Sequence, residues 1–513
     1  MRRSADKFPE KTALITQDAR VTYSALNARV NRLAHAFLDA GLQKGDRVAA
    51  ILHNGAEFVE AYFACAKSGG VFVPLNNLLK EREFRQILDY IQPRFLMAAP
   101  EFEELIRGLA PEMPFLEHPW SLSEQPGAPF RSYESLLRGG APHEPGVTVS
   151  DDDLMSIFLT SGTTGRPKGA MRSHRQNVIN AMTGAIEMKL GYDDRAVILF
   201  PMYHVTFEDQ LRYFLMGNTV YIRREGAFDP KEVLEILARE RITICQFVPT
   251  MVSAMLQEAS IEQHDLSRLR LIPYAAAPMP VDLLKRAMAR FQCQFAQFYG
   301  QTETGPLTTL LRPEDHVLDG TEAQLARLAS SGRAVVDYEV RIVGEDGADV
   351  PVGEVGEIVV RSEAAMNGYW GLPEETARTI RDGWIHTGDF GRLDEERYVY
   401  IVDRKNDMII SGGKNIYPRE LEEIIYTHPA VLDVAVVGVP DDYWGESVKA
   451  VVVLREGMQA TEEEIIALCR ENLASYKKPK SVEFREELPR TTTGKIRKKE
   501  IRDGFWKGKD RRV

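Results

Sequence analysis

Apolar residues near the start of the chain follow helical and strand-like spacings in turn. Within 22–41 they recur every three or four positions, at Leu26, Val30, Leu33 and Phe37. This spacing predicts an amphipathic helix. The apolar runs at 47–54 and 71–75 predict strands, and the segment 56–68 between them predicts a second helix.

The same alternation of short apolar strands and helical segments returns at 197–260 and around 269–300. It is typical of α/β layers built on a largely parallel sheet. Residues 100–150 differ, because they are rich in Pro, Gly and Glu and their periodicity is weak. We therefore expect a loop-rich excursion within the first domain there.

The pattern changes at about residue 331, where strands separated by acidic turns predict a β-rich subdomain. The last stretch of about 100 residues has the size and mixed pattern of a separate α+β domain. The polar segment 404–407 marks the boundary. The predicted fold is therefore α/β. A large domain (1–405), made of layered α/β subdomains and the β-rich subdomain, precedes a small mobile α+β domain (406–513).

Composition narrows the function classes. The chain has 513 residues, is 44% hydrophobic and 27% charged, and carries a formal net charge of -11. This charge argues against nucleic-acid binding, and no apolar run is long enough to cross a membrane. The N-terminus lacks the apolar stretch of a secretory signal. Because the cysteines lie far apart, at Cys65, Cys245, Cys293 and Cys469, we expect free thiols and a cytoplasmic protein.

A candidate phosphate-binding loop, TSGTTGRPKG, spans 160–169 after an apolar strand-like run. Glycines let the backbone approach an anion, and hydroxyls and free N–H groups can cradle phosphate oxygens. It is not a Walker A loop, because Lys168 follows a proline and precedes Gly169 where Ser or Thr would bind the metal. On its own, such a segment is as compatible with an ordinary turn.

Three further motifs carry candidate polar chemistry. Glu303 lies in Tyr299–Gly305 between two threonines and could hold Mg²⁺ near a phosphate. Asp389 follows a glycine in WIHTGD and could accept ribose hydroxyls, and Lys495 lies among small residues in TTTGKI. Each has a plain structural alternative, respectively a solvated charge, a hairpin turn and a solvated basic face.

The order and separation of these motifs resemble the adenylate-forming superfamily of acyl-CoA synthetases, peptide-synthetase adenylation domains and luciferases. Asp403-Arg404-Lys405, the segment 411–418 and Gly368-Tyr369-Trp370 add to the resemblance, which runs from about residue 8 to 502. It implies an acyl-CoA synthetase. Such an enzyme uses ATP and Mg²⁺ to form an acyl-adenylate and pyrophosphate, then transfers the acyl group to coenzyme A and releases AMP.

The resemblance also implies an ATP site. Loop residues would surround the β- and γ-phosphates: Thr160, Ser161, Gly162, Thr163, Thr164, Gly165 and Lys168. Others would line the adenine and the neighbouring hairpin: Ala275, Ala276, Ala277, Tyr299, Gly300 and Gln301. Thr163 and Glu303 would hold Mg²⁺, and Thr302 would lie near the α-phosphate. Asp389 and Arg404 would hold the ribose, and Lys495 would neutralise the charge that grows during adenylation.

The acyl and CoA sites are implied in the same way. The acyl pocket would be lined by His204, Val205, Thr206, Gln246, Phe247 and Ala276. The CoA-facing residues would be Gly412, Gly413, Lys414, Tyr476 and Lys480, brought in when the small domain rotates about Asn406. A buried unpaired amide is costly. Gln246 therefore favours an acid with a polar substituent, unless it turns away to bond the backbone.

Several functions remain open at this point. The acid is either fatty or small and functionalised. The acyl group could pass to an acceptor other than CoA, and the chain could be a catalytically silent nucleotide-binding protein.

A peptide-synthetase domain would need an Asp near Tyr203 and His204 to hold a substrate amine, and no Asp is adjacent to them. A luciferase-type oxygenase shares the ATP motifs. The expected partners are small molecules, with a homodimer left open.

Overall fold

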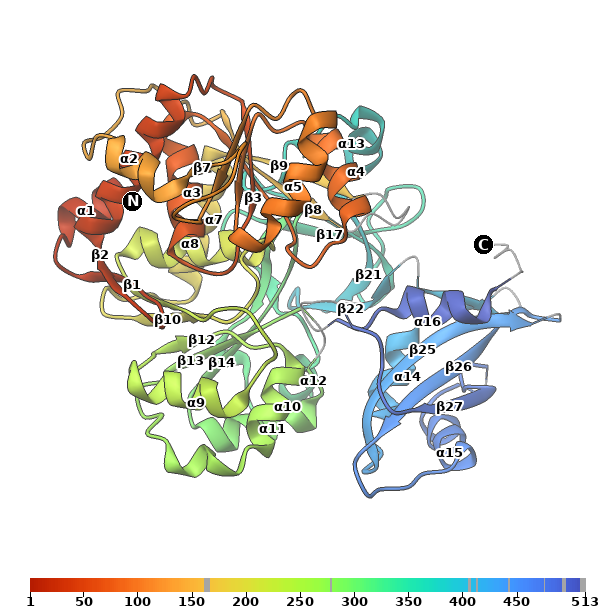
Figure 1. Ribbon diagram of the computed structural model, residues 1–513. Coiled ribbons are helices and arrows are strands. Elements are labelled where there is room, and N and C mark those ends of the chain that lie inside the picture. The colour runs from red at the N-terminus through yellow and green to blue at the C-terminus, as the bar shows by residue number, and fades with distance from the viewer. Residues whose placement is uncertain are drawn as a thin grey trace.

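The computed structural model describes residues 1–160, 167–276, 279–404, 407–411, 414–441, 443–474, 476–490 and 495–507 (Figure 1). Two large sheets and the helices between and around them form most of the first 335 residues. A smaller sheet follows them. A fourth sheet, drawn in blue in Figure 1, forms a separate body with its own core. The predicted fold class, with a large N-terminal and a small C-terminal domain, is confirmed.

The first sheet has eight strands in the order β19-β9-β8-β4-β3-β5-β6-β7. Their bounds are β3 (Arg47–Ile51), β4 (Val71–Pro74), β5 (Phe95–Ala98), β6 (His118–Ser121), β7 (Arg131–Ser132), β8 (Leu154–Thr160), β9 (Lys168–Ser173) and β19 (Gly368–Tyr369). The central pairs are parallel, whereas β9 is antiparallel to both β8 and β19. The helices α4 (Glu81–Ile91) and α5 (Glu103–Leu109) cover its outer face.

The second sheet has nine strands in the order β16-β15-β14-β13-β12-β10-β11-β1-β2. Their bounds are β1 (Thr12–Ile15), β2 (Arg20–Thr22), β10 (Arg195–Ile198), β11 (Thr219–Ile222), β12 (Ile244–Cys245), β13 (Leu271–Tyr274), β14 (Gln294–Gln301), β15 (Gly305–Leu311) and β16 (Arg333–Ala334). Helices α9 (Pro230–Arg239), α10 (Pro249–Gln257) and α11 (Val281–Phe291) pack on its outer face.

A middle layer of helices lies between the two sheets and shares one core with both. It contains α2 (Tyr23–Asp39), α3 (Ala56–Ser68), α6 (Tyr133–Gly139), α7 (His174–Glu187) and α8 (Thr206–Met216). The buried stripe Leu26, Val30, Leu33 and Phe37 of α2 is the one that its sequence spacing predicts. Strand ends from both sheets and the starts of α7 and α8 therefore converge on one region.

Residues 100–150 correct the sequence-based expectation of a loop-rich excursion. They contain α5, β6, β7 and α6, and two of these elements extend the first sheet. Trp120 and Tyr133 are almost fully buried in the middle core. Strands of two to four residues are too short to show the alternation of apolar and polar residues that predicts a strand. The Pro and Gly residues around them predict loops instead.

The third sheet is antiparallel and consists of β17 (Glu339–Val343), β18 (Gly356–Arg361), β20 (Ile380–Arg381), β21 (Trp384–Leu393) and β22 (Val399–Arg404). It is the predicted β-rich subdomain. The short helix α12 (Glu322–Arg327) precedes it in sequence, and α13 (Pro373–Thr379) lies between β18 and β20. The remaining helix of the large domain, α1 (Arg2–Lys7), lies at the N-terminus.

The small domain holds the fourth sheet. Its strands are β23 (Ile409–Ser411), β24 (Lys414–Ile416), β25 (Val431–Asp441), β26 (Gly445–Leu454) and β27 (Ser481–Arg485). Its helices are α14 (Pro418–Ile425), α15 (Glu462–Asn472) and α16 (Lys498–Phe505). The predicted boundary between 405 and 406, and with it Asn406, lies outside the described residues, so it stays a prediction. Within the described ranges, no helix is long and apolar enough to cross a membrane.

Candidate active site

The predicted phosphate loop begins at the end of β8 and ends at the start of β9, and these two strands pair antiparallel. Thr160 ends β8 and lies directly opposite Lys168, the first residue of β9. The Lys168 ammonium forms an ion pair with Glu375 at 2.5 Å, and its Nζ lies 5.1 Å from the centre of the Tyr369 ring. Five predicted phosphate-loop residues between them lie outside the described residues, so their roles stay predictions: Ser161, Gly162, Thr163, Thr164 and Gly165.

A second hairpin, β14–β15, carries the Tyr299–Gly305 motif beside Asp389 of β21. The Tyr299 hydroxyl donates a hydrogen bond to Asp389 Oδ2 at 2.8 Å, and Gln301 Nε2 donates to the same oxygen at 2.7 Å. Gly300 is required here, since a Cβ on it would lie 2.4 Å from the Pro306 carbonyl oxygen. The hairpin thus places three of the predicted nucleotide residues together.

Asp389 and Arg404 are paired in the β21–β22 ladder, where each is the direct partner of the other. The Asp389 side chain is buried, with 4% of its surface exposed. Although 15 residues apart in sequence, the two predicted ribose contacts therefore belong to a single antiparallel rung at the end of β22, next to the small domain.

Glu303, the predicted Mg²⁺ ligand, accepts a hydrogen bond from the Tyr369 hydroxyl at 2.8 Å. Burial, and then the nearby Glu303 carboxylate, raise the pKa of Tyr369, so Tyr369 stays a donor. No cluster of three His, Cys, Asp or Glu side chains among the described residues could hold a metal alone. A single carboxylate fits Mg²⁺, which keeps waters and phosphate oxygens as its other ligands.

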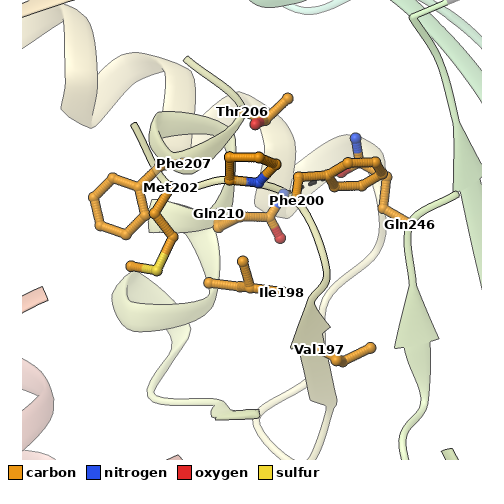
Figure 2. Close-up of a pocket in the computed structure, with 9 residues that line it drawn as sticks. Val197, Ile198, Phe200, Met202, Thr206, Phe207, Gln210 and Gln246 are labelled. Atoms are coloured by element: carbon orange, nitrogen blue, oxygen red, sulfur yellow. Dashed lines mark hydrogen bonds between the residues drawn. The ribbon is translucent and has the colours of Figure 1, made fainter. Parts of the chain in front are cut away.

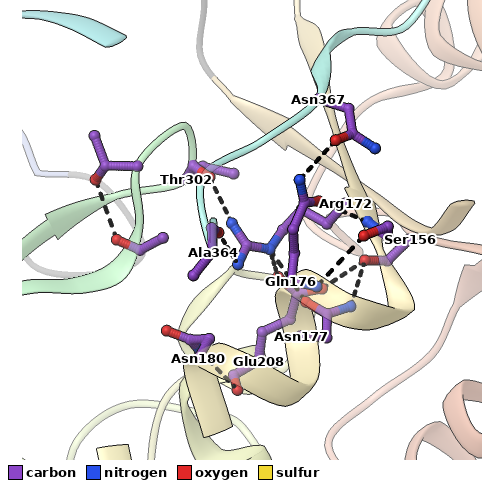
Figure 3. A network of polar contacts seen from close by, with 12 residues as sticks. Ser156, Arg172, Gln176, Asn177, Asn180, Glu208, Thr302, Ala364 and Asn367 are labelled. Carbon is purple, nitrogen blue, oxygen red and sulfur yellow. Dashed lines mark hydrogen bonds and ion pairs between the residues drawn. The ribbon is translucent and has the colours of Figure 1, made fainter. Parts of the chain in front are cut away.

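A buried polar network supports the turn that contains Thr302 (Figure 3). The Arg172 guanidinium forms an ion pair with Glu208 at 2.8 Å, and both side chains are fully buried. Arg172 also donates to the Ala364 carbonyl at 2.9 Å and to the Thr302 carbonyl at 3.5 Å. Burial raises the pKa of Glu208, and the positive charge of Arg172 opposes that shift. The network thus links β9, α8 and the Thr302 turn.

His204 lies in the segment just before α8 of the large domain and is influenced by a charge of the small domain. Burial, with the nearby Lys495 ammonium as the second cause, lowers the pKa of His204 to about 4. The imidazole is therefore neutral over the physiological range. The Lys495 charge of the small domain thus acts on a large-domain residue that is predicted to border the acyl pocket.

A small cavity lies at the start of α8 (Figure 2). It offers a volume of about 10 Å³, enough for roughly one water molecule. Its walls are formed by Val197, Ile198, Phe200, Pro201, Met202, Thr206, Phe207, Gln210 and Gln246. Two of the predicted acyl-pocket residues, Thr206 and Gln246, thus border it. His204, Val205, Phe247 and Ala276 are not among its walls.

Among the described residues, the amide of Gln246 bonds to another side chain and not to the backbone. Gln210 Nε2 donates to Gln246 Oε1 at 3.0 Å and lies 3.3 Å from Asp209 Oδ2. Asp209 in turn pairs with Arg212, and both are buried. Gln210 is not predictable from sequence, because no sequence signal shows that this helix buries four neighbouring polar residues, Glu208, Asp209, Gln210 and Arg212.

The predicted adenine segment follows β13. Ala275 is buried and Ala276 is exposed, and Ala276 adopts the left-handed conformation with φ = 74°. A side chain is unfavourable there and glycine is preferred. Ala277 lies outside the described residues.

Of the predicted CoA residues, the structure describes three, all on the small domain. Lys414 Nζ lies 4.4 Å from the centre of the Tyr476 ring, and Tyr476 is 43% exposed. Lys480 bonds to Asp441 at 3.0 Å, and hydrogen bonds from the Trp444 N–H and from Lys480 lower the pKa of Asp441 to about 2. Gly412 and Gly413 lie outside the described residues.

Comparison with known proteins identifies the family. The model for "AMP-binding enzyme" matches residues 1–370, and that for "AMP-binding enzyme C-terminal domain" matches 420–495. A feruloyl-CoA synthase from Amycolatopsis is 39% identical over 505 residues, which cover 98% of each chain. Two solved structures resemble the fold closely. ATP-bound MatB from Rhodopseudomonas palustris is 31% identical over 98% of each chain, with a TM-score of 0.89. The anthranilate CoA ligase AuaEII in complex with anthranoyl-AMP is 29% identical over 98% of this chain and 96% of the other, with a TM-score of 0.90. The chain therefore belongs to the AMP-binding enzyme family, the adenylate-forming superfamily that its motifs resemble.

Proposed function

We propose that the chain is an ATP-dependent carboxylate–CoA ligase, an acyl-CoA synthetase that works through an acyl-adenylate. The observation that carries this proposal is that motifs far apart in the sequence interact in the folded chain. Tyr299 and Gln301 bond to Asp389, Asp389 is the ladder partner of Arg404, and the charge of Lys495 in the small domain helps to lower the pKa of His204. Relatives named as CoA ligases favour CoA over another acceptor.

In the first half-reaction a carboxylate oxygen of the acid attacks the α-phosphorus of ATP. A P–O bond forms, the bond to the β-phosphate breaks, and pyrophosphate leaves. No general base is needed, because the acid is already ionised. The protein must hold two anions together in line and stabilise the charge that grows between them. Lys495 is suited to this, since its positive charge is close enough to lower the pKa of His204.

Asp389 and Arg404 would orient the ribose, and Tyr299 would stack on the adenine, while its hydroxyl holds Asp389 in place. Glu303 and Thr163 would hold Mg²⁺, with the Tyr369 hydroxyl fixing the Glu303 carboxylate. When bound, Mg²⁺ neutralises phosphate charge. His204 stays neutral beside the acid and therefore does not pair with its carboxylate as a cation.

In the second half-reaction the CoA sulfur attacks the acyl carbonyl and AMP leaves, while the thiol proton passes to solvent. Rotation of the small domain about Asn406 would withdraw Lys495 and bring Gly412, Gly413 and Lys414 to the site. Tyr476 and Lys480 would contact the nucleotide end of CoA. The exposed Tyr476 ring and the neighbouring Lys414 ammonium are suited to a base and to phosphate, respectively.

The acid is a small functionalised carboxylate rather than a long alkyl chain. The cavity beside Gln246 is about the size of one water molecule, and its polar side chains make it unsuited to an alkyl end. The test is acid-dependent exchange of pyrophosphate into ATP with a panel of carboxylic acids, followed by thioester formation with CoA. Absence of exchange with every acid would reject the proposed function.

The variant Lys495→Ala separates the two half-reactions. We expect it to abolish adenylation yet spare thioester formation from a supplied acyl-adenylate, because its charge serves only the first step. Lys507→Ala, an exposed lysine of the same domain, is the matched control and should change neither step. An equal loss of both half-reactions in Lys495→Ala would contradict the assigned role of the lysine.

A further inference from the structure

The cavity at the start of α8 combines an apolar wall with an unusual polar end. Val197, Ile198, Phe200, Met202 and Phe207 supply the apolar surface. Thr206, Gln210 and Gln246 supply the polar groups. Since the volume is about that of one water molecule, only the tip of a larger molecule could enter it.

The orientation of the Gln210 amide is fixed by its neighbour Asp209. Arg212 pairs with Asp209, and Asp209 Oδ2 accepts a hydrogen bond from Gln210 Nε2 at 3.3 Å. Asp209 therefore faces the Gln210 amino group. The same amino group donates to Gln246 Oε1. Its two N–H bonds are thus directed to Asp209 and Gln246.

Three polar groups remain at the cavity. The carbonyl of Gln210 and the amino group of Gln246 make no hydrogen bond within the described part of the chain. The Thr206 hydroxyl is buried and has no partner there either. A buried polar group without a partner is destabilising, and native proteins seldom keep one without a reason. The three residues that carry this acceptor, donor and hydroxyl all line the same small cavity.

We propose that this cavity is the far end of the acyl pocket and that it binds a hydroxyl group of the acid, with Gln210 as acceptor and Gln246 and Thr206 as its other partners. The substrate class is thus a carboxylic acid with a compact apolar body and a hydroxyl at the end remote from its carboxylate. This inference rests on the proposed function. Gln210 is the specificity residue that it adds.

A hydroxyl suits these partners better than an ion does. It both donates and accepts, which matches the acceptor of Gln210 and the donor of Gln246. A second carboxylate would lie near Asp209, and an ammonium would meet no unpaired anion, because Asp209 already pairs with Arg212. Burying either ion without a partner is strongly unfavourable.

The experiment measures kcat/KM for pyrophosphate exchange with matched pairs of acids. The pairs are ω-hydroxyalkanoic and para-hydroxylated arylalkanoic acids of increasing length, each with its counterpart lacking the hydroxyl. We expect the unmodified enzyme to prefer the hydroxylated member of at least one pair by about tenfold. Exchange without such a preference in any pair would overturn the inference while leaving the proposed function standing. No exchange at all would instead reject the function.

The variant Gln210→Met keeps the length of the side chain and removes its acceptor. The hydroxyl preference should fall by about tenfold, and Thr206→Val should also reduce it. Gln257→Met, on the exposed end of α10, is the matched control and should leave both activity and preference unchanged. If Gln210→Met does not fold, Thr206→Val carries the test. An unchanged preference in the folded variants would overturn the assignment.

Discussion

Replacing Glu208 with Gln tests whether the buried network under the Thr302 turn stabilises the large domain. The change preserves the size and shape of the side chain and removes its charge. The Ser156 hydroxyl, which donates to Glu208 Oε1 at 2.5 Å, can still donate to a Gln carbonyl. Arg172 would lose its anion, however, and neither side chain has any exposed surface.

The expected cost follows from this burial. Removing one partner of a buried ion pair typically destabilises a protein by about 3–5 kcal/mol. Arg172 would retain neutral acceptors at 2.9 Å on Ala364 and at 3.1 Å on Asn177. We therefore expect the lower end, about 3 kcal/mol, which is a large part of the roughly 5–15 kcal/mol that usually stabilises a protein.

The assay is urea unfolding followed by tryptophan fluorescence, with Trp120 buried in the middle core as a reporter. Because the chain has two domains, the transition assigned to the large domain is compared rather than a single global free energy. The control is Arg286→Gln, which breaks an exposed i,i+4 pair with Asp282 and should cost less than about 1 kcal/mol.

A double variant, Arg172→Met with Glu208→Gln, sharpens the test. It removes both charges together, so it should be more stable than Glu208→Gln alone. A Glu208→Gln protein that unfolds within about 0.5 kcal/mol of the Arg286→Gln control would refute the reasoning. The pair would then not need its charge, and the Thr302 turn would depend on other contacts.

Two further predictions concern His204 and Ala276. The folded pKa of His204 is lowered to about 4, so the stability that neutral His204 contributes is present above about pH 6.5 and is lost as pH falls toward 4. Lys495→Ala should raise the pKa of His204 in an NMR titration. The pKa should still lie below its ordinary value, because burial is the larger cause of the shift. An identical pKa in both proteins would mean that Lys495 lies elsewhere in solution. Ala276→Gly should relieve the unfavourable φ of 74° and raise the free energy of unfolding by about 0.5–1 kcal/mol in thermal unfolding. The control Ala275→Gly changes a buried residue without positive φ and should lower the free energy of unfolding.

The sequence predicted the elements whose periodicity is long enough to read. The predicted helix at 56–68 matches α3, because its apolar side chains face one core across several turns. Segment 100–150 failed because β6 and β7 have four and two residues, too few to show alternation. Short strands are stabilised mainly by the strands and helices that pack against them, and a single sequence does not show which elements these will be.

The site was predictable as far as its residues belong to local motifs. Asp389 and Arg404 could be named from their sequence context, but their pairing on one ladder rung is a property of the fold. Gln210 and Arg172 could not be found, because polar residues in a helix or strand usually face water. Gln210 is buried because α8 packs between two sheets, and Arg172 of β9 is buried against Glu208 of the same helix; no spacing rule reveals that a polar face is the inner one.

The position of the Asp389–Arg404 rung has a consequence for a site that serves two reactions. Arg404 is the last residue of β22, and it belongs to the same sheet as Asp389. A rotation of the small domain that begins after residue 405 would leave this rung, and the Tyr299 and Gln301 contacts to Asp389, unchanged. Lys495 lies on the other side of the boundary and would move away from His204. The nucleotide could therefore stay bound in one place while the groups that act on it are exchanged, which is what consecutive reactions of one adenylate require.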